Sequence, residues 1–214
     1  MKNALILFLK YPEPGKVKTR IAKDIGNKSA CAIYRQMAEG IIRNIVIKNQ
    51  KFYDVHIFFT PKNKEDKIRD WLNIDVFYRR QEGKTLGERM FNSLKQLFQL
   101  EDYKRGIIVG TDCPMIDVPL IENAFRILEK KEIVIGPSRD GGYYLLGMSK
   151  PDSKYFQWMS MYDLFMDITW STDKVFDQTM EKIRKNNLSC HILQTLFDID
   201  TKEDLFMYFR RVNN

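Results

Sequence analysis

The chain has 214 residues, of which 44% are hydrophobic and 29% charged, and its formal net charge is +7. This length suits one α/β domain with a sizeable core, and the composition is that of a globular protein. Three widely spaced cysteines support neither a disulfide framework nor a zinc knuckle, and two histidines exclude most histidine-based metal or triad chemistry. The positive charge indicates affinity for anions but does not name the anion.

The first apolar run, Ala4–Leu9, is too short to span a membrane, and Lys10 interrupts it. No small-residue cleavage site follows, so the run does not have the form of a signal peptide. We therefore expect a cytoplasmic protein without a membrane partner, in which this run is a buried strand.

Apolar runs alternate with amphipathic stretches along the chain. Strands are predicted at Ala4–Leu9, Val55–Phe59, Ile74–Tyr78, Ile107–Val109, Ile133–Ile135, Tyr143–Met148 and His191–Leu193. Helices are predicted at Ser29–Ile47, Lys64–Leu72, Leu86–Leu97, Leu120–Lys130, Lys174–Lys185 and Lys202–Arg210. The alternation predicts a three-layer αβα sandwich with a mainly parallel, mixed sheet, in a single domain over residues 1–214. Residues 155–170, rich in aromatics and methionine, are predicted to be an inserted lid or a helix pair.

The segment after the first strand combines a turn with several cations. Pro14 fixes the backbone and Gly15 allows a tight turn before a helix expected to begin past Ala22. The residues that follow Gly15 are Lys16, Val17, Lys18, Thr19 and Arg20. Cations and free backbone amides near a helix start suit a phosphate chain, although a solvated basic turn has the same pattern.

The segment Gly83-Lys84-Thr85 imitates the end of a Walker A loop, but Tyr78 stands where that motif requires a glycine. A P-loop is therefore rejected. We interpret the segment as a glycine-hinged turn in which Thr85 caps a helix. Gln81, just before it, could read the edge of a base.

Acids follow two of the predicted strands. Asp112 ends the run Gly106–Asp112 at the carboxyl end of a central strand, where ligands bind in such sheets. A carboxylate there is a natural ligand for Mg²⁺ or Mn²⁺, and its alternative role is to cap a turn. Asp198 and Asp200 lie on one side of an extended segment and could complete a metal site with Asp112. Alternatively, Asp200 or Thr201 caps the last helix. The segments Thr85–Glu88 and Thr201–Asp204 both have the form of a capping box at a helix start.

The segment Asp140-Gly141-Gly142 has the sequence of a hairpin turn before a strand. Its two glycines would also let the backbone approach a ligand closely. Asp140 is then the candidate general base for an alcohol acceptor, whereas a phosphate acceptor needs no base.

Together these stretches resemble the DUF2064 glycosyltransferase-like family of the nucleotide-diphospho-sugar transferase superfamily, which has the GT-A fold. The matching segments, in the family's order, are KYPEPGKVKTRI, LGERM, GTDCPMI, GPSRDGGYYLLG, WSTDKV and FDIDTKEDL. More distantly, the chain is similar to molybdenum-cofactor and 2-phospholactate guanylyltransferases. Sugar-transferring relatives often carry Asp-x-Asp, but this chain has a single acid in Thr111-Asp112-Cys113.

The resemblance implies a role for each matching segment. The loop containing Pro14, Gly15, Lys16, Lys18, Thr19 and Arg20 would wrap a nucleotide, with its cations on the phosphates. Gln81 and Gly87 would contact the base, and Asp140, Gly141, Gly142 and Trp170 would lie on the acceptor side. Asp112 and Asp200 would hold Mg²⁺ or Mn²⁺. Lys18, Arg20, Asp112 and Asp140 would be the catalytic set.

The function that this implies is metal-dependent transfer of a nucleotidyl or glycosyl group from a nucleoside triphosphate or nucleotide sugar to a small acceptor. Two alternatives are a catalytically inactive nucleotide sensor and a nucleic-acid-binding module. The latter is disfavoured because acids are interleaved with the basic residues and no nucleic-acid-binding motif occurs. The sequence leaves the oligomeric state open, and a homodimer is compatible with a small enzyme of this type.

Overall fold

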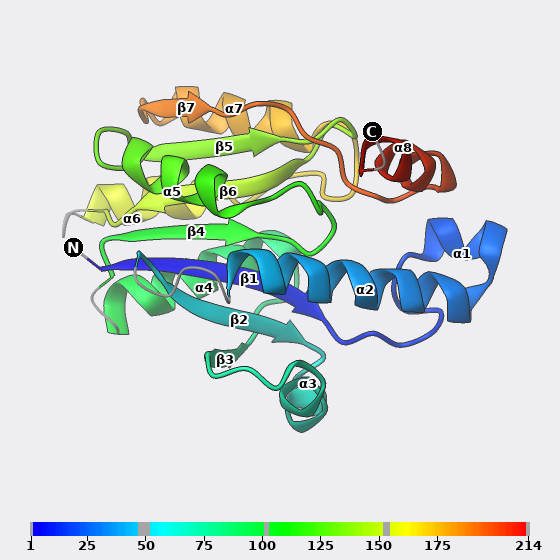
Figure 1. The fold of residues 1–214 in the computed structure, drawn as a ribbon. Helices are drawn as coiled ribbons and strands as arrows, with labels where there is room; N and C mark the ends of the chain where they lie inside the picture. Colours follow the sequence, from blue (N-terminus) through cyan, green and yellow to red (C-terminus); the bar gives the residue numbers. More distant parts are fainter. Residues whose placement is uncertain (1, 47–51, 101–102, 152–154, 213–214) are drawn as a thin grey trace.

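The computed structural model describes residues 2–46, 52–100, 103–151 and 155–212. Its strands form one sheet in the order β3-β2-β1-β4-β6-β5-β7 (Figure 1). The strands are β1 (Asn3–Lys10), β2 (Asp54–Thr60), β3 (Phe77–Arg80), β4 (Arg105–Val109), β5 (Ile133–Pro137), β6 (Tyr143–Ser149) and β7 (Cys190–Ile192). Strands β1 to β4 are mutually parallel, β6 is antiparallel to both β4 and β5, and β7 is parallel to β5. This confirms the predicted mainly parallel, mixed sheet.

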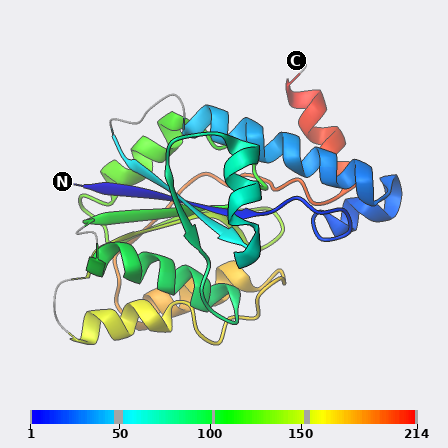
Figure 2. The same ribbon diagram turned by 90° about the horizontal axis from the view of Figure 1, so that it is seen from below.

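Helices cover both faces of the sheet. They are α1 (Thr19–Ile25), α2 (Asn27–Ile45), α3 (Glu65–Leu72), α4 (Leu86–Leu100), α5 (Val118–Ile127), α6 (Tyr155–Asp163), α7 (Val175–Lys185) and α8 (Lys202–Val212). Figure 2 shows α2 and α5 on one side of the sheet and α4, α6 and α7 on the other. The three-layer αβα architecture is thus confirmed. Among the helices that the structure describes, none has both the length and the apolar character needed to cross a bilayer.

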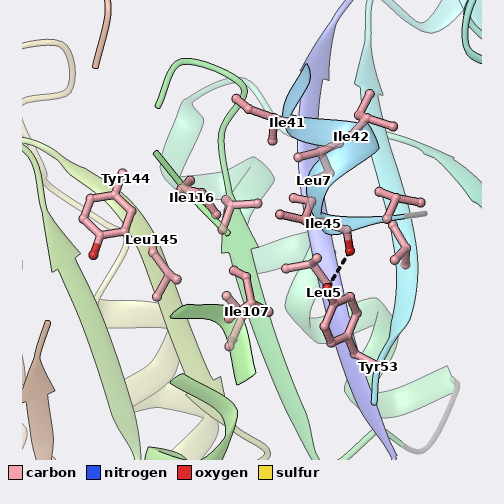
Figure 3. Close-up of a cluster of buried hydrophobic side chains, with 14 of the residues drawn as sticks. Leu5, Leu7, Ile41, Ile42, Ile45, Tyr53, Ile107, Ile116, Tyr144 and Leu145 are labelled. Carbon is pink, nitrogen blue, oxygen red and sulfur yellow. Dashed lines mark hydrogen bonds between the residues drawn. The ribbon is translucent and has the colours of Figure 1, made fainter. Parts of the chain in front are cut away.

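Strand β1 contains an uninterrupted apolar run because side chains on both of its faces are buried in the core. Leu5 and Leu7 face one layer and pack with Ile41 of α2 (Figure 3), while Ala4 and Ile6 face the opposite layer with α4 and α7. Side chains alternate between the two faces of a strand, and both faces of this sheet are covered by helices. A buried central strand therefore has no polar face.

Several of the predicted element boundaries differ from those in the structure. The first helix was expected past Ala22, but α1 begins at Thr19 and ends at Ile25, and Gly26, with a φ of 82°, separates it from α2. The strand expected at Ile74–Tyr78 begins later, as β3, because only residues 77–80 pair with β2. The lid or helix pair predicted for residues 155–170 contains one helix, α6, followed by turns, and residues 152–154 before it lie outside the described part.

Two capping boxes predicted from the sequence are confirmed. Thr85 Oγ1 accepts a hydrogen bond from Glu88 N, and Glu88 Oε2 accepts one from Lys84 N, at the start of α4. Thr201 and Asp204 make the corresponding reciprocal bonds at the start of α8. Each box satisfies backbone donors that have no partner inside the helix. These caps fix two helix starts next to the carboxyl edge of the sheet.

Candidate active site

A cavity of about 780 Å³ opens at the carboxyl ends of the central strands. It is bounded by the start of α1, the start of α4, the loop after β4, the β5–β6 hairpin and residues 170–175 and 198–200. Of the predicted site residues, those that line it are Lys18, Thr19, Arg20, Asp112, Asp140, Gly142, Trp170 and Asp200. The position agrees with the rule that ligands of open α/β sheets bind beyond the carboxyl ends of the strands.

At one side of the cavity, a lysine bridges two carboxylates. Lys18 Nζ lies 2.6 Å from Asp112 Oδ1 and 2.9 Å from Asp200 Oδ1. The Lys18 side chain is 3% exposed, whereas those of Asp112 and Asp200 are 47% and 37% exposed. Burial disfavours the charged ammonium, but the two carboxylates outweigh it and raise the pKa of Lys18 well above its ordinary value. Lys18 is therefore a permanent cation in this site.

The backbone brings the two acids together. Ile199 N donates a hydrogen bond of 2.9 Å to the Asp112 carbonyl oxygen, which ties the segment before α8 to the loop after β4. Lys18 itself precedes α1 in a left-handed conformation, with φ 47° and ψ 46°. Such backbone conformations are uncommon for residues other than glycine and cluster at functional sites.

Tyr34 of α2 holds the turn that carries Asp112. Its buried hydroxyl lies 3.1 Å from Thr111 Oγ1, donates to the Lys10 carbonyl oxygen and accepts from Lys10 N. Burial is the main reason that the pKa of Tyr34 rises to about 12, and the Asp112 carboxylate adds to it. The end of β1 and the end of β4 are thus joined through one hydroxyl. Sequence reasoning did not find Tyr34, which looks like any core aromatic of an amphipathic helix.

Two further carboxylates face the cavity. Asp198 is partly buried, and burial, followed by the charges of Asp112 and Asp140, raises its pKa to about 7. Asp140 Oδ1 accepts hydrogen bonds from Ser138 Oγ and from Gly142 N within the β5–β6 turn. The Asp140 side chain is exposed.

One wall of the cavity is apolar and aromatic. The rings of Tyr143 and Trp170 meet edge to face at a centroid distance of 6.4 Å, and Leu86 and Met90 extend the wall from α4. Trp170 was predicted from the family resemblance. The other three were missed because their spacing, on a helix face and at a strand start, has the pattern of ordinary core residues.

Several predicted residues do not line the cavity. Gly15 is in a turn with φ 78°, closed by Lys16 N donating to Glu13 O, and Pro14 and Lys16 are exposed. Gln81 Nε2 donates a hydrogen bond of 2.8 Å to the Phe58 carbonyl oxygen, so its side-chain amide is bonded to the backbone.

Gly87 and Gly141 act through close backbone packing. A Cβ on Gly87 would overlap the Phe165 carbonyl oxygen and crowd Trp170. Gly141, with φ 86°, packs against the Asp173 backbone, and its carbonyl oxygen accepts from Phe176 N. Both glycines therefore shape the wall around Trp170 without lining the cavity themselves.

The donor set at Lys18 suits a hard divalent ion. Among the described residues, no three carboxylate, imidazole or thiol groups meet as a ready-made metal centre. Mg²⁺ is nevertheless commonly held by one or two carboxylates, with phosphate and water oxygens completing its shell. Asp112 and Asp200 fit that requirement, since both are partly exposed to the cavity and converge on one point.

Comparison with known proteins identifies relatives for this chain. A solved structure from Desulfovibrio desulfuricans, provisionally named a nucleotide-diphospho-sugar transferase, is 33% identical with a TM-score of 0.90, and the match covers 100% of this chain and 89% of that one. A Mycobacterium tuberculosis protein solved as a complex with manganese has a TM-score of 0.55 and 10% identity, covering 99% of this chain and 98% of that one, and so shares the fold alone.

The curated relative is 2-phospho-L-lactate guanylyltransferase of Methanocaldococcus jannaschii, which is 29% identical over 126 residues. The match covers 58% of this chain and 50% of the relative, so the chain spans half the length of that protein. The family model described as "Uncharacterized protein conserved in bacteria (DUF2064)" matches residues 44–172, which is more than half of the chain. The fold is that of nucleotide-diphospho-sugar transferases, and the chain belongs to the DUF2064 family.

Proposed function

We propose that this protein is a metal-dependent transferase that moves a nucleotidyl or glycosyl group from a nucleotide substrate to a small acceptor. The observation that carries the proposal is the convergence of Lys18, Asp112 and Asp200 in the lining of a cavity of about 780 Å³. Two carboxylates and a buried cation beyond the carboxyl edge of the sheet are the groups that a polyphosphate chain and its metal ion require.

The proposed roles follow from charge. Asp112 and Asp200 would hold Mg²⁺ or Mn²⁺, and such an ion neutralises the charge that develops on phosphate oxygens when the leaving group departs. Lys18 and Arg20 would supply further positive charge to the phosphates from the start of α1. Arg20 is 61% exposed and 3.9 Å from Asp200, so it can turn toward a ligand. Charge that is in place before the reaction is commonly the largest catalytic contribution.

Between the two reactions, we favour nucleotidyl transfer. The curated relative is named a guanylyltransferase, and this chain has the single acid Asp112 after its central strand. The structural relative from D. desulfuricans is named for nucleotide sugars, which supports glycosyl transfer as the second candidate. Nucleotidyl transfer needs mainly alignment of the donor with an oxygen of the acceptor.

The acceptor would enter from the β5–β6 hairpin. Asp140 is exposed there and is the group we assign to remove a proton from an alcohol acceptor. The aromatic wall of Tyr143 and Trp170 would receive the less polar part of the same molecule. An acceptor that is already an oxyanion would need alignment only.

Calorimetry with a panel of nucleoside triphosphates and nucleotide sugars, with and without Mg²⁺ or Mn²⁺, tests the proposal. We expect metal-dependent binding of triphosphates, with one base preferred, and its loss in Asp112→Ala. Asp75→Ala, at an exposed acid outside the cavity, is the matched control and should bind normally. Preferred binding of a nucleotide sugar would select glycosyl transfer, and binding of neither class by the folded protein would refute the proposal.

A further inference from the structure

The position of the Lys18 ammonium has a consequence for metal binding. The same two carboxylates that the proposed function gives to the divalent ion are already occupied, by Lys18 Nζ at 2.6 Å and 2.9 Å. One positive charge cannot fully compensate two carboxylates, yet it competes for the same oxygen atoms and repels a second cation. The ion and the ammonium therefore cannot both hold the two Oδ1 atoms, and an ion bound through the Oδ2 atoms would lie close to the ammonium and be repelled by it.

The lysine side chain is built to leave this position. Its Cα is fixed at the start of α1, but the ammonium is carried on a flexible four-carbon stem with three donor hydrogens. At 3% exposure the ammonium has little solvation where it lies, so it depends on the carboxylates for compensation. A phosphate group in the cavity would offer the Lys18 ammonium another anion, whose oxygen atoms could replace those of the carboxylates.

We infer that Lys18 is a displaceable cation that occupies the carboxylate pair until nucleotide arrives. Without a nucleotide, the ammonium holds Asp112 and Asp200 together and keeps the divalent ion out. With one, the ammonium moves to the phosphates and releases the carboxylates to the ion, so the ion and nucleotide bind as a pair. This inference rests on the proposed function in assigning the ion to these two residues.

Titration of the metal-stripped protein with Mn²⁺ alone tests the inference without any turnover. The wild type should bind Mn²⁺ weakly, and Lys18→Met, which removes the charge but keeps the side-chain length, should bind at least tenfold more tightly. Lys18→Arg keeps the charge and should remain weak. Lys23→Met removes one charge from an exposed position on the same helix and should match the wild type.

A second measurement uses the unaltered protein, in case Lys18→Met fails to fold. Reductive methylation followed by peptide mass spectrometry reports how accessible and how basic each amine is. Lys18 should react slowly in metal-free protein and several-fold faster at saturating Mn²⁺, because the ion takes its carboxylate partners. Lys23 should react at the same rate in both conditions.

The outcomes separate the inference from the proposed function. If Lys18→Met binds Mn²⁺ no more tightly than the wild type, or if Mn²⁺ leaves the Lys18 labelling rate unchanged, the exchange is refuted. Wild-type protein that still binds a Mn²⁺–triphosphate complex would then leave the proposed function intact. If the wild type and the Lys18→Met variant both fail to bind Mn²⁺, with or without a triphosphate, the inference and the proposed function fail together.

Discussion

Replacing Asp198 by asparagine should stabilise the metal-free protein, and more so at pH 8 than at pH 4. The pKa of Asp198 is about 7 instead of its ordinary 3.8, mainly because of burial and then because of the neighbouring charges of Asp112 and Asp140. Near pH 4 the Asp198 carboxyl is largely protonated in the folded state, so it lowers the free energy of unfolding only slightly. As pH rises toward 7, the unfolded chain loses this proton first, so the free energy of unfolding falls. Asparagine imitates the protonated form at every pH.

The size of the effect follows from the shift. If the whole rise in the pKa of Asp198 acted on stability, the ionised carboxylate would lower the free energy of unfolding by roughly 4 kcal/mol at pH 8. Solvent reaches part of the Asp198 side chain and screens it, so we expect about 2 kcal/mol at pH 8 and close to zero at pH 4. For a domain of this size, that is a rise in the melting temperature of roughly 4–8 °C at pH 8.

Thermal melts in EDTA at pH 4, 6 and 8 check this expectation, since EDTA removes any ion that would favour the ionised carboxylate. Asp173→Asn, at an exposed acid lining the same cavity, is the control and should melt close to the wild type. An Asp198→Asn shift that is equal at all three pH values, or a loss of stability at pH 8, would show that this carboxyl is not held protonated by its surroundings.

Three other substitutions have defined outcomes. Asp112→Ala should weaken metal-dependent nucleotide binding on the order of 100-fold by calorimetry, with an unchanged circular dichroism spectrum. Gly87→Ala should lower the melting temperature and the nucleotide affinity together, because the new Cβ would overlap the Phe165 carbonyl oxygen. Tyr34→Phe should cost about 1–3 kcal/mol in urea unfolding, because Thr111 Oγ1 and the Lys10 backbone lose a buried partner. If Asp112→Ala bound nucleotide with wild-type affinity, Asp112 would not belong to the metal site. If Gly87→Ala or Tyr34→Phe were as stable as the wild type, the packing or hydrogen bonds assigned to that residue would be wrong.

The local pattern was sufficient to predict most of the fold. Both faces of β1 are buried, so its apolar run identified a central strand, and the caps at Thr85 and Thr201 marked the starts of α4 and α8. The first turn of the short helix α1 was missed, because the helix has only seven residues, between the left-handed Lys18 and Gly26. Boundaries of this kind depend on contacts that a window of sequence does not contain.

The sequence alone placed Asp112 at the carboxyl edge of the sheet, because this acid closely follows a predicted central strand and parallel strands end at the same edge. It could not determine that Lys18 bridges Asp112 and Asp200, because this depends on the Ile199–Asp112 backbone hydrogen bond, which joins residues far apart in the chain. The folded chain likewise decided that Gln81 bonds to backbone and that Tyr143 and Met90 face the cavity. Polarity and spacing are encoded residue by residue, whereas the direction of a side chain is fixed only when distant segments pack against it.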